Sequence, residues 1–535
     1  MYGRKRFTIG RRSFVRVTTA GAAGLYLAQG CDSAEPAERV RALVVGSGFG
    51  GSIAALRLAE AGIPSTVLER GKRWEITDDY DTFCTTQNPD GRAAWMHREP
   101  VIPGVPAIRL RMSPYVGLLE RFFGENLDVV CAAGVGGGSL VYSGIMIQPP
   151  RDLFESVFPA ELDYGEMDAT WYPRVREVMR PGTMPDDVLE AEPYLSSRIF
   201  IRDAMTAGLD VQRIQCAMDW DLVRAELTGE VPPQVITGDY LYGLNSGAKH
   251  SLDRVGYLAQ AEATGMVDVR PLHQVKSVGA IEGGGYWAEV ERIDENGNVL
   301  ETTRIEADLL FMAAGSMNTT KLMLKAKRDA TLPGLNDQVG EAWGNNGQRI
   351  LVRGELDEPT GANHGGPACV FVHHHDNPEG PIGMEFGPAP IGFEHNCLVS
   401  ATQGVPERLG RLQLDVQTVG DEEIIGIVPE WDRSWDASAG RAARHTMQRF
   451  VDAAGGALTS LPGVDDPSIT FHPLGGMTMG RATDTYGRVE GYAHLYVVDS
   501  ALIPGSTPAG NPFWTVSAIA ERAMDTIVRE DLAGE

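Results

Sequence analysis

A glycine-rich turn near the start of the chain constrains the fold more than any other feature. Residues 42–45 form an apolar run typical of a buried strand, and the segment Gly-Ser-Gly-Phe-Gly-Gly follows at residues 46–51. A helical pattern over residues 52–61 and a second predicted strand over residues 65–69 come next, and that strand ends in Glu69. An acid about twenty residues after glycines of this spacing is typical of a dinucleotide-binding βαβ unit.

The glycines of this turn have separate tasks. We expect Gly46 to form the tight turn, Gly48 to leave room for a pyrophosphate, and Gly51 to let the helix pack closely against the strand. The N-terminus of the helix would direct its positive potential at the phosphates. Glu69 would hold the hydroxyls of a ribose. The sequence therefore predicts a bound dinucleotide.

Strand patterns of the same kind return later in the chain. Residues 286–292 and 299–305 predict a hairpin around an Asn-Gly turn, and residues 309–314 predict a separate buried parallel strand that ends at a glycine. Residues 495–499 predict another strand, and residues 512–529 predict a helix. The strands of one sheet thus come from the beginning, middle and end of the chain.

A chain of 535 residues exceeds the usual size of one hydrophobic core, so we expect two intertwined domains. The fold class is α/β, with a discontinuous Rossmann-like nucleotide-binding domain and a second domain built from the insertions. The expected boundaries are 39–73, 250–341 and 486–535 for the nucleotide-binding domain, 74–249 and 342–485 for the substrate domain, and 1–38 for a leader and linker.

Charge and the N-terminal leader restrict the class of protein. A net charge of −25 repels phosphate backbones, so nucleic-acid binding is not expected. Residues 1–30 hold six basic residues and no acid, and Arg11-Arg12 with the short, weakly apolar segment behind it resembles a twin-arginine export signal. We therefore expect a secreted or cell-envelope protein. Cys31 follows a sequence similar to a lipoprotein cleavage box and is a candidate for a lipid anchor.

No metal site is expected. The remaining cysteines lack CxxC spacing and are interpreted as buried thiols. The only histidine cluster is His373-His374-His375. Consecutive residues of an extended segment point to opposite faces, so this cluster is interpreted as a solvated surface run.

A second glycine loop favours FAD over NAD as the dinucleotide. Residues 134–140 read Gly-Val-Gly-Gly-Gly-Ser-Leu, and such a loop can lay bare backbone along a flavin ring. Export also favours a tightly held prosthetic group, because a diffusible nicotinamide would be scarce outside the cytoplasm.

Several segments resemble the glucose–methanol–choline (GMC) oxidoreductase family, and within it the bacterial cholesterol oxidases that hold FAD without a covalent bond. These segments occur in order along the chain at residues 83–90, 114–119, 134–140, 272–276, 471–476 and 502–506. The resemblance implies non-covalent FAD and a substrate domain with a mainly antiparallel sheet covered by helices.

Three catalytic residues follow from the resemblance. His472 matches the histidine that orients the substrate hydroxyl, and Asn511 matches the asparagine that supports the reduced flavin. Glu385 matches the base of a steroid isomerisation. The residues themselves agree with these roles. Histidine can share a hydroxyl proton near neutral pH, Asn511 before Pro512 is typical of an N-cap, and the apolar neighbours of Glu385 would raise its pKa.

The resemblance also implies a set of cofactor contacts and shows two departures. The family pattern Asn-Gly-Gly-Met is replaced by Tyr-Ser-Gly-Ile at residues 142–145, and the loop before Asn511 is one residue longer. The flavin environment, oxygen reactivity and substrate choice depend on these positions. Beside the glycines and Glu69, the implied contacts are Phe49, Gly50, Gly138, Tyr142, Ser143, Ile145, Val275, Asp499, Ser500 and Phe513.

The implied activity is that of a cholesterol oxidase with steroid Δ-isomerase activity. It would oxidise a sterol, with O2 as acceptor and H2O2 as product, and shift the double bond from Δ5 to Δ4. We expect a monomer that contacts a membrane transiently to extract sterol. Three alternatives stay open: oxidation of another bulky alcohol or use of another acceptor, a non-redox flavoprotein like the hydroxynitrile lyases, and a non-catalytic flavin-binding protein.

Overall fold

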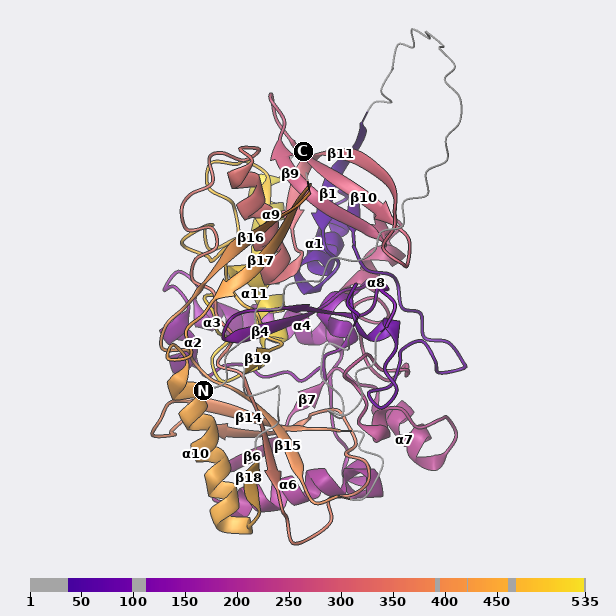
Figure 1. Cartoon of the computed structure of the whole chain (residues 1–535), viewed down its shortest axis with the longest axis vertical. Coiled ribbons are helices and arrows are strands. Elements are labelled where there is room, and N and C mark those ends of the chain that lie inside the picture. The colour runs from indigo at the N-terminus through magenta and orange to yellow at the C-terminus, as the bar shows by residue number, and fades with distance from the viewer. Residues whose placement is uncertain (1–36, 99–111, 390–394, 421, 460–467, 534–535) are drawn as a thin grey trace. The chain divides into compact units, whose positions relative to one another are not determined.

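The computed structural model describes residues 37–98, 112–389, 395–420, 422–459 and 468–533 (Figure 1). The predicted export signal with Arg11 and Arg12, and the candidate lipid site Cys31, lie outside the described residues. In these described ranges, no helix is both long and apolar enough to cross a bilayer.

A seven-stranded sheet joins distant parts of the chain. Its strands lie in the order β8-β2-β1-β11-β10-β9, and β20 pairs with the free part of β11. The first, middle and last thirds of the chain all contribute to it. The strands are β1 (Glu38–Val45), β2 (Ser65–Leu68), β8 (Val267–Arg270), β9 (His273–Ala280), β10 (Tyr286–Ile293), β11 (Val299–Met312) and β20 (Leu495–Val497).

The strand β11 differs from the expected pattern. The sequence predicted two strands here, over residues 299–305 and 309–314, but the structure has one strand of 14 residues. Its first part pairs antiparallel with β10, and its last part pairs parallel with β1 and β20. The chain stays extended between the two predicted runs. The acidic side chains there lie on the outer face of the strand, where the Asp308 carboxylate accepts hydrogen bonds from Arg39 and Arg41.

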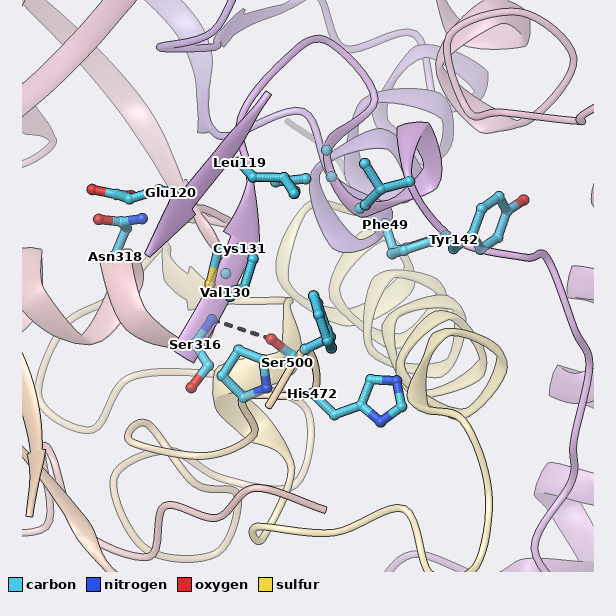
Figure 2. Close-up of a pocket in the computed structure, with 18 of the residues that line it drawn as sticks. Phe49, Leu119, Glu120, Val130, Cys131, Tyr142, Ser316, Asn318, His472 and Ser500 are labelled. Atoms are coloured by element: carbon cyan, nitrogen blue, oxygen red, sulfur yellow. Dashed lines mark hydrogen bonds between the residues drawn. The ribbon is translucent and has the colours of Figure 1, made fainter. Parts of the chain in front are cut away.

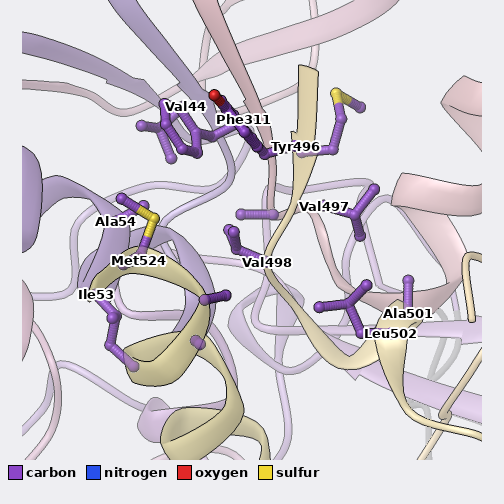
Figure 3. Close-up of a cluster of buried hydrophobic side chains, with 14 of the residues drawn as sticks. Val44, Ile53, Ala54, Phe311, Tyr496, Val497, Val498, Ala501, Leu502 and Met524 are labelled. Atoms are coloured by element: carbon purple, nitrogen blue, oxygen red, sulfur yellow. The ribbon is translucent and has the colours of Figure 1, made fainter. Parts of the chain in front are cut away.

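Helices bury the core against this sheet. Helix α1 (Phe49–Glu60) begins three residues earlier than predicted, directly after Gly48. Helix α11 (Pro512–Thr526) packs against α1, and one more helical turn, Ile527–Asp531, follows it. Figure 3 shows buried side chains of the sheet meeting those of both helices. This packing fixes the glycine turn and the start of α11 relative to each other.

The second sheet is antiparallel throughout, with the order β18-β12-β15-β14-β13-β6. Helices α6 (Leu195–Thr206) and α10 (Ala437–Ala454) pack against it (Figure 1). The predicted α/β class and the antiparallel, helix-covered second sheet are therefore confirmed. Its strands are β6 (Asp210–Arg213), β12 (Arg349–Gly354), β13 (Val370–His374), β14 (Ile382–Gly387), β15 (Leu398–Gln403) and β18 (Ala457–Thr459).

The interpretation of the histidine run as a solvated surface is wrong for its middle residue. His374 is buried, and its Nδ1 lies 2.8 Å from Oγ1 of Thr446 on α10. The flanking His373 and His375 are partly exposed. The alternation along β13 was expected, but the sequence did not show that α10 covers one face.

A small three-stranded sheet precedes the second glycine loop and the segment that holds His472. It has the order β19-β4-β3, from β3 (Leu119–Phe122), β4 (Leu127–Ala132) and β19 (Ser468–Thr470). The second glycine loop follows β4, and His472 follows β19.

The remaining elements form the hairpin β16 (Arg411–Val419) and β17 (Glu422–Glu430), the pair β5 (Gly182–Thr183) and β7 (Gln215–Cys216), and seven further helices. Those helices among the described residues are α2 (Arg151–Val157), α3 (Tyr164–Glu166), α4 (Tyr172–Met179), α5 (Asp186–Glu190), α7 (Trp220–Thr228), α8 (Tyr257–Ala263) and α9 (Gly315–Arg328).

Candidate active site

One cavity of about 1080 Å³ brings the predicted residues together (Figure 2). It is lined by the glycine turn, the second glycine loop, the start of α9, the start of α11 and the second sheet. Every candidate catalytic and cofactor residue named from the sequence lines it, with the exception of Gly51.

The glycine turn has the geometry that its sequence predicted. Gly46 has φ +103°, and a Cβ there would lie 2.3 Å from the carbonyl oxygen of Ala313. A Cβ on Gly51 would lie 2.0 Å from the carbonyl oxygen of Gly46, so Gly51 serves helix packing and not the cavity. A Cβ on Gly48 would have no neighbour within 4 Å, which leaves open space beside the helix N-terminus.

Glu69 is tied to the same turn. Its carboxylate accepts from the Ser47 hydroxyl at 2.7 Å, the Ser47 amide at 3.2 Å and the Gly71 amide at 2.9 Å. A carboxylate offers about four lone-pair positions, so one acceptor position stays open toward the cavity. The side chain can thus hold a hydroxyl while it also stabilises the turn.

Aromatic rings form one wall of the cavity. The Phe513 ring lies 5.4 Å from the Phe49 ring and 5.0 Å from the Tyr142 ring, between centroids. The Tyr142 hydroxyl donates to the carbonyl oxygen of His250 at 2.6 Å, so its polar end is satisfied away from the rings. The departure from the family pattern at residue 142 therefore adds an aromatic ring to this wall.

Asp499 connects the end of β20 to the start of α9. Its carboxylate accepts from the Gly315 amide at 2.8 Å and from the Thr319 hydroxyl at 2.5 Å. Burial raises the pKa of Asp499 to about 6. Next to it, the Ser500 hydroxyl accepts from the Ser316 amide at 3.1 Å (Figure 2).

Asn346 fixes the tautomer of His472. The Asn346 Oδ1 accepts from the Thr507 amide at 2.9 Å, which sets the orientation of the side-chain amide. Its Nδ2 donates to the Gly510 carbonyl at 2.9 Å and faces Nδ1 of His472 at 3.3 Å. Burial lowers the pKa of His472 to about 3, so the ring is neutral. Nδ1 is therefore an acceptor, and the ring proton is on Nε2.

Glu385 lies beside Asn511. The Asn511 Nδ2 donates to the two carboxylate oxygens at 3.5 and 3.3 Å, and Gln403 Nε2 donates to Oε1 at 3.2 Å. Burial raises the pKa of Glu385 to about 7, and these hydrogen bonds oppose that rise. A carboxyl group of this pKa can take up and release a proton near neutral pH.

Asn511 occupies the predicted N-cap position, and Pro512 is the first residue of α11. Its side chain, however, makes no capping hydrogen bond and turns toward Glu385. Asn511 therefore occupies the N-cap position, but its side chain does not cap the helix. The Asn511 Oδ1 is buried and has no hydrogen-bond partner in the described part of the chain.

Three residues near the site were not identified from the sequence: Asn346, Gln403 and Lys249. Asn346 has φ +59°, and the Asn-Asn-Gly segment was the available signal for such a turn. Lys249 is buried, its Nζ donates to the Leu140 carbonyl at 2.6 Å, and burial lowers its pKa to about 7. Neither Lys249 nor Gln403 has a local sequence signal, because each acts through contacts distant along the chain.

Comparison with known proteins identifies the family. A model described as GMC oxidoreductase matches residues 406–520, the part that holds His472 and Asn511. The chain is 24% identical to a cholesterol oxidase from Acinetobacter baumannii, over 91% of this chain and 94% of that protein. Residues 406–520 thus match the GMC oxidoreductase family.

Other proteins are similar to this chain over comparable lengths. A cholesterol oxidase from Mycobacterium tuberculosis is 26% identical, over 90% of each chain. The crystal structure of pyridoxine 4-oxidase from Mesorbium loti matches with a TM-score of 0.62 at 16% identity, over 92% of this chain and 99% of the other. That likeness shows the fold. The resemblance drawn from the sequence motifs is thus confirmed at the level of the family.

GMC oxidoreductases generally bind FAD, and the cavity fits this group. Gly48 leaves space at the N-terminus of α1, where a helix favours phosphate oxygens. Glu69 has an open acceptor position, and three aromatic rings supply an apolar wall. Asn511 also lines the cavity, and its Oδ1 has no hydrogen-bond partner in the described part of the chain.

Proposed function

We propose that this GMC oxidoreductase oxidises the 3β-hydroxyl of a sterol, with non-covalently bound FAD and with O2 as the acceptor that is reduced to H2O2. We further propose that it isomerises the Δ5 ketone to the Δ4 ketone. The observation that carries this proposal is the meeting of a neutral His472, Asn511 and Glu385 in one cavity. The names of the cholesterol oxidase relatives support the choice of substrate.

The character of the cavity supports a bulky apolar alcohol. The cavity lining is mostly apolar, and a fused-ring hydrocarbon can be buried against such a surface. Glu385 forms no ion pair within the described ranges. The apolar residues that line the same cavity include Ile145, Leu241, Ile350, Pro388, Ala389, Val399, Ala401 and Phe471.

In the oxidation step, His472 positions the alcohol. When bound, FAD supplies the acceptor for the hydride that leaves the alcohol carbon. The His472 Nε2–H can donate to the hydroxyl oxygen and fix the carbon relative to that acceptor. Because burial disfavours the imidazolium, His472 acts by orientation. The hydroxyl proton is released to solvent, and one proton is taken up again when O2 is reduced to H2O2. Asn511 offers its amide next to the same position.

In the isomerisation step, Glu385 moves one proton. The carboxylate takes the proton from C4 of the Δ5 ketone, the electron pair shifts across the conjugated system, and the same proton returns at C6. No other reactant is needed. The hydrogen bonds from Asn511 and Gln403 hold the carboxylate in its place on β14.

Three of the nucleophilic side chains near the cavity support a flavin that is held without a covalent bond. The Nδ1 of His472 faces the Asn346 amide, and the Tyr142 hydroxyl is engaged with a carbonyl. Burial raises the pKa of the Cys131 thiol to about 12, which makes it a poor nucleophile. None of these three groups is prepared for attachment.

The decisive experiment is anaerobic addition of cholesterol to the purified holoenzyme. The flavin absorption should bleach, and admission of air should restore it with formation of H2O2. An unchanged spectrum with cholesterol but bleaching by another alcohol of a panel would shift the proposal to that substrate. A flavoprotein that acts as a lyase would not bleach with any alcohol, and that result would overturn the proposal.

A further inference from the structure

Gln403 and Glu385 are neighbours on one face of the second sheet. Glu385 on β14 pairs with Ala401 on β15, and Gln403 stands two residues beyond Ala401, so both side chains leave the same face. Gln403 is completely buried, and its Nε2 lies 3.2 Å from Oε1 of Glu385. The contact is thus set by the register of two adjacent strands.

The other half of the Gln403 amide is unused. Its Oε1 is buried and has no hydrogen-bond partner in the described part of the chain. A buried, unpaired carbonyl oxygen costs about 1–3 kcal/mol. Rotation of the amide by half a turn would leave the nitrogen unpaired in place of the oxygen. Rotation therefore adds no further unpaired polar atom, and the two orientations differ mainly in what they offer to Glu385.

We propose that Gln403 is a positioning residue that holds Glu385 in both of its protonation states. Its Nε2–H donates to the carboxylate, and after rotation its Oε1 accepts from the carboxylic acid. This inference rests on the proposed isomerisation. There the C4–H bond breaks as a Glu385 O–H bond forms, and the O–H bond breaks as the C6–H bond forms. Gln403 would hold the proton-bearing oxygen between the two transfers.

The surroundings of Glu385 make this amide important. On either side in the sheet lie Phe371 and Ala401, which offer no polar side-chain group. Asn511 approaches from the start of α11 and donates. The titratable neighbour is the Cys216 thiol on β7, whose pKa burial raises well above its usual value, so it stays neutral. Gln403 is therefore the amide on the same sheet that can offer either a donor or an acceptor.

The test replaces Gln403 by Met, which keeps length and volume but removes both hydrogen-bonding groups. A Δ5-3-ketosteroid is supplied directly to the oxidised holoenzyme, so that isomerisation is measured without hydride transfer. The hydrogen bond to the charged carboxylate is stronger than the one from the neutral acid, so the loss of both should raise the pKa of Glu385 and move the pH profile of isomerisation to higher pH. On the acid side of the profile, the reaction should slow about tenfold for every increase of 1 in that pKa. Infrared titration of the Glu385 carboxyl, with Glu385→Gln as blank, should show the same increase.

The outcomes separate the inference from the proposed function. If the wild type does not isomerise the ketone, the proposed isomerisation is wrong and so is the role of Gln403 in it, whatever the infrared titration shows. If the wild type isomerises but Gln403→Met leaves both the pH profile and the infrared titration unchanged, only the role of Gln403 is overturned. A slower reaction with neither the pH profile nor the infrared titration displaced would mean a merely structural role.

Two further variants control for folding. Thr402→Val alters the adjacent buried residue of β15, whose side chain leaves the opposite face, and should keep the wild-type pH profile. If Gln403→Met does not fold, Gln403→Asn keeps an amide but withdraws it by one methylene, and the same displacement of the pH profile is expected. A wild-type profile in the folded Asn variant would contradict the inference.

Discussion

The Nδ2 of Asn346 lies 3.3 Å from the Nδ1 of His472, and the orientation of that amide is fixed by the Thr507 backbone. The ring of His472 therefore presents an N–H to the cavity. A side chain in this state can align an alcohol oxygen but is a poor proton acceptor. In the proposed reaction, the roles of orienting group and proton-moving group are therefore divided between His472 and Glu385.

Replacement of His472 by Gln should slow flavin reduction. Removal of one positioned hydrogen bond of this kind commonly costs about 10²- to 10³-fold in rate. Asn511→Leu should slow the same step, because it removes the amide that is proposed to support the reduced flavin. Stopped-flow absorbance of the flavin under anaerobic conditions measures this rate. His445→Gln on α10, which does not line the cavity, is the control. Wild-type reduction rates in both site variants would contradict the assignment.

Replacement of Glu385 by Gln should separate oxidation from isomerisation. The amide keeps the shape of the carboxyl but cannot act as a base, so the Δ5 ketone should accumulate while flavin reduction continues. In the wild type, isomerisation should decline as the pH falls below about 7, because the carboxylate is then protonated. Product analysis for the conjugated enone measures both effects. Release of the Δ4 product by Glu385→Gln at the wild-type rate would refute the role of Glu385.

The same variant should change the pH dependence of stability. Burial raises the pKa of Glu385 from 4.5 to about 7 in the folded state, so this group favours folding fully below pH 4.5, and that contribution is lost as the pH rises through 7. Glu385→Gln avoids the buried charge, so relative to wild type it should gain up to about 3 kcal/mol between pH 4.5 and pH 8. Thermal unfolding of both holoproteins at the two pH values measures this. The exposed Glu125→Gln should show no such pH dependence.

Acid precipitation should release the flavin. If FAD is held without a covalent bond, unfolding removes every contact that retains it, and yellow FAD should appear in the supernatant. The released compound can be distinguished from FMN by chromatography. Flavin that stays with the pellet would show a covalent bond.

Export should depend on the arginine pair of the leader. Arg11→Lys with Arg12→Lys keeps the charge but removes the twin-arginine pattern, so the protein should stay in the cytoplasm. Fractionation of cells followed by a flavin assay measures this. Arg4→Lys with Arg6→Lys, which alters the basic character equally, should export normally. Unchanged secretion of the first double variant would refute the prediction.

Glycine spacing and hydrophobic periodicity predicted the parts of the fold in which the interacting residues are close in sequence. The βαβ opening was recognisable because glycine spacing and hydrophobic periodicity act over a few residues, and the turn has the expected geometry at Gly46 and Gly48. The continuity of β11 was missed, because a strand with two different partners shows two different patterns along its length. The burial of His374 depends on α10, which is distant in sequence.

The site was predictable only in part, for the same reason. His472, Asn511 and Glu385 were named from a resemblance, and the residues alone gave weak support. Asn346 and Gln403 act on them across long stretches of chain. The Asn-Asn-Gly segment was a signal for the turn at Asn346 but not for its contact with His472, and the contact of Gln403 depends on strand register.

The seven-stranded sheet cannot be completed until the last part of the chain has been synthesised. The central strand β11 receives its last partner, β20, from the end of the chain, and α11 brings Asn511 to the cavity after that. Translation proceeds from the N-terminus, and domains generally fold as they emerge. Here the glycine turn leaves the ribosome first, yet its surroundings are completed by the final segment. We therefore expect the cofactor to be bound only after β20 and α11 have been synthesised, and a nascent chain stalled before β20 would carry the nucleotide motif without a complete site.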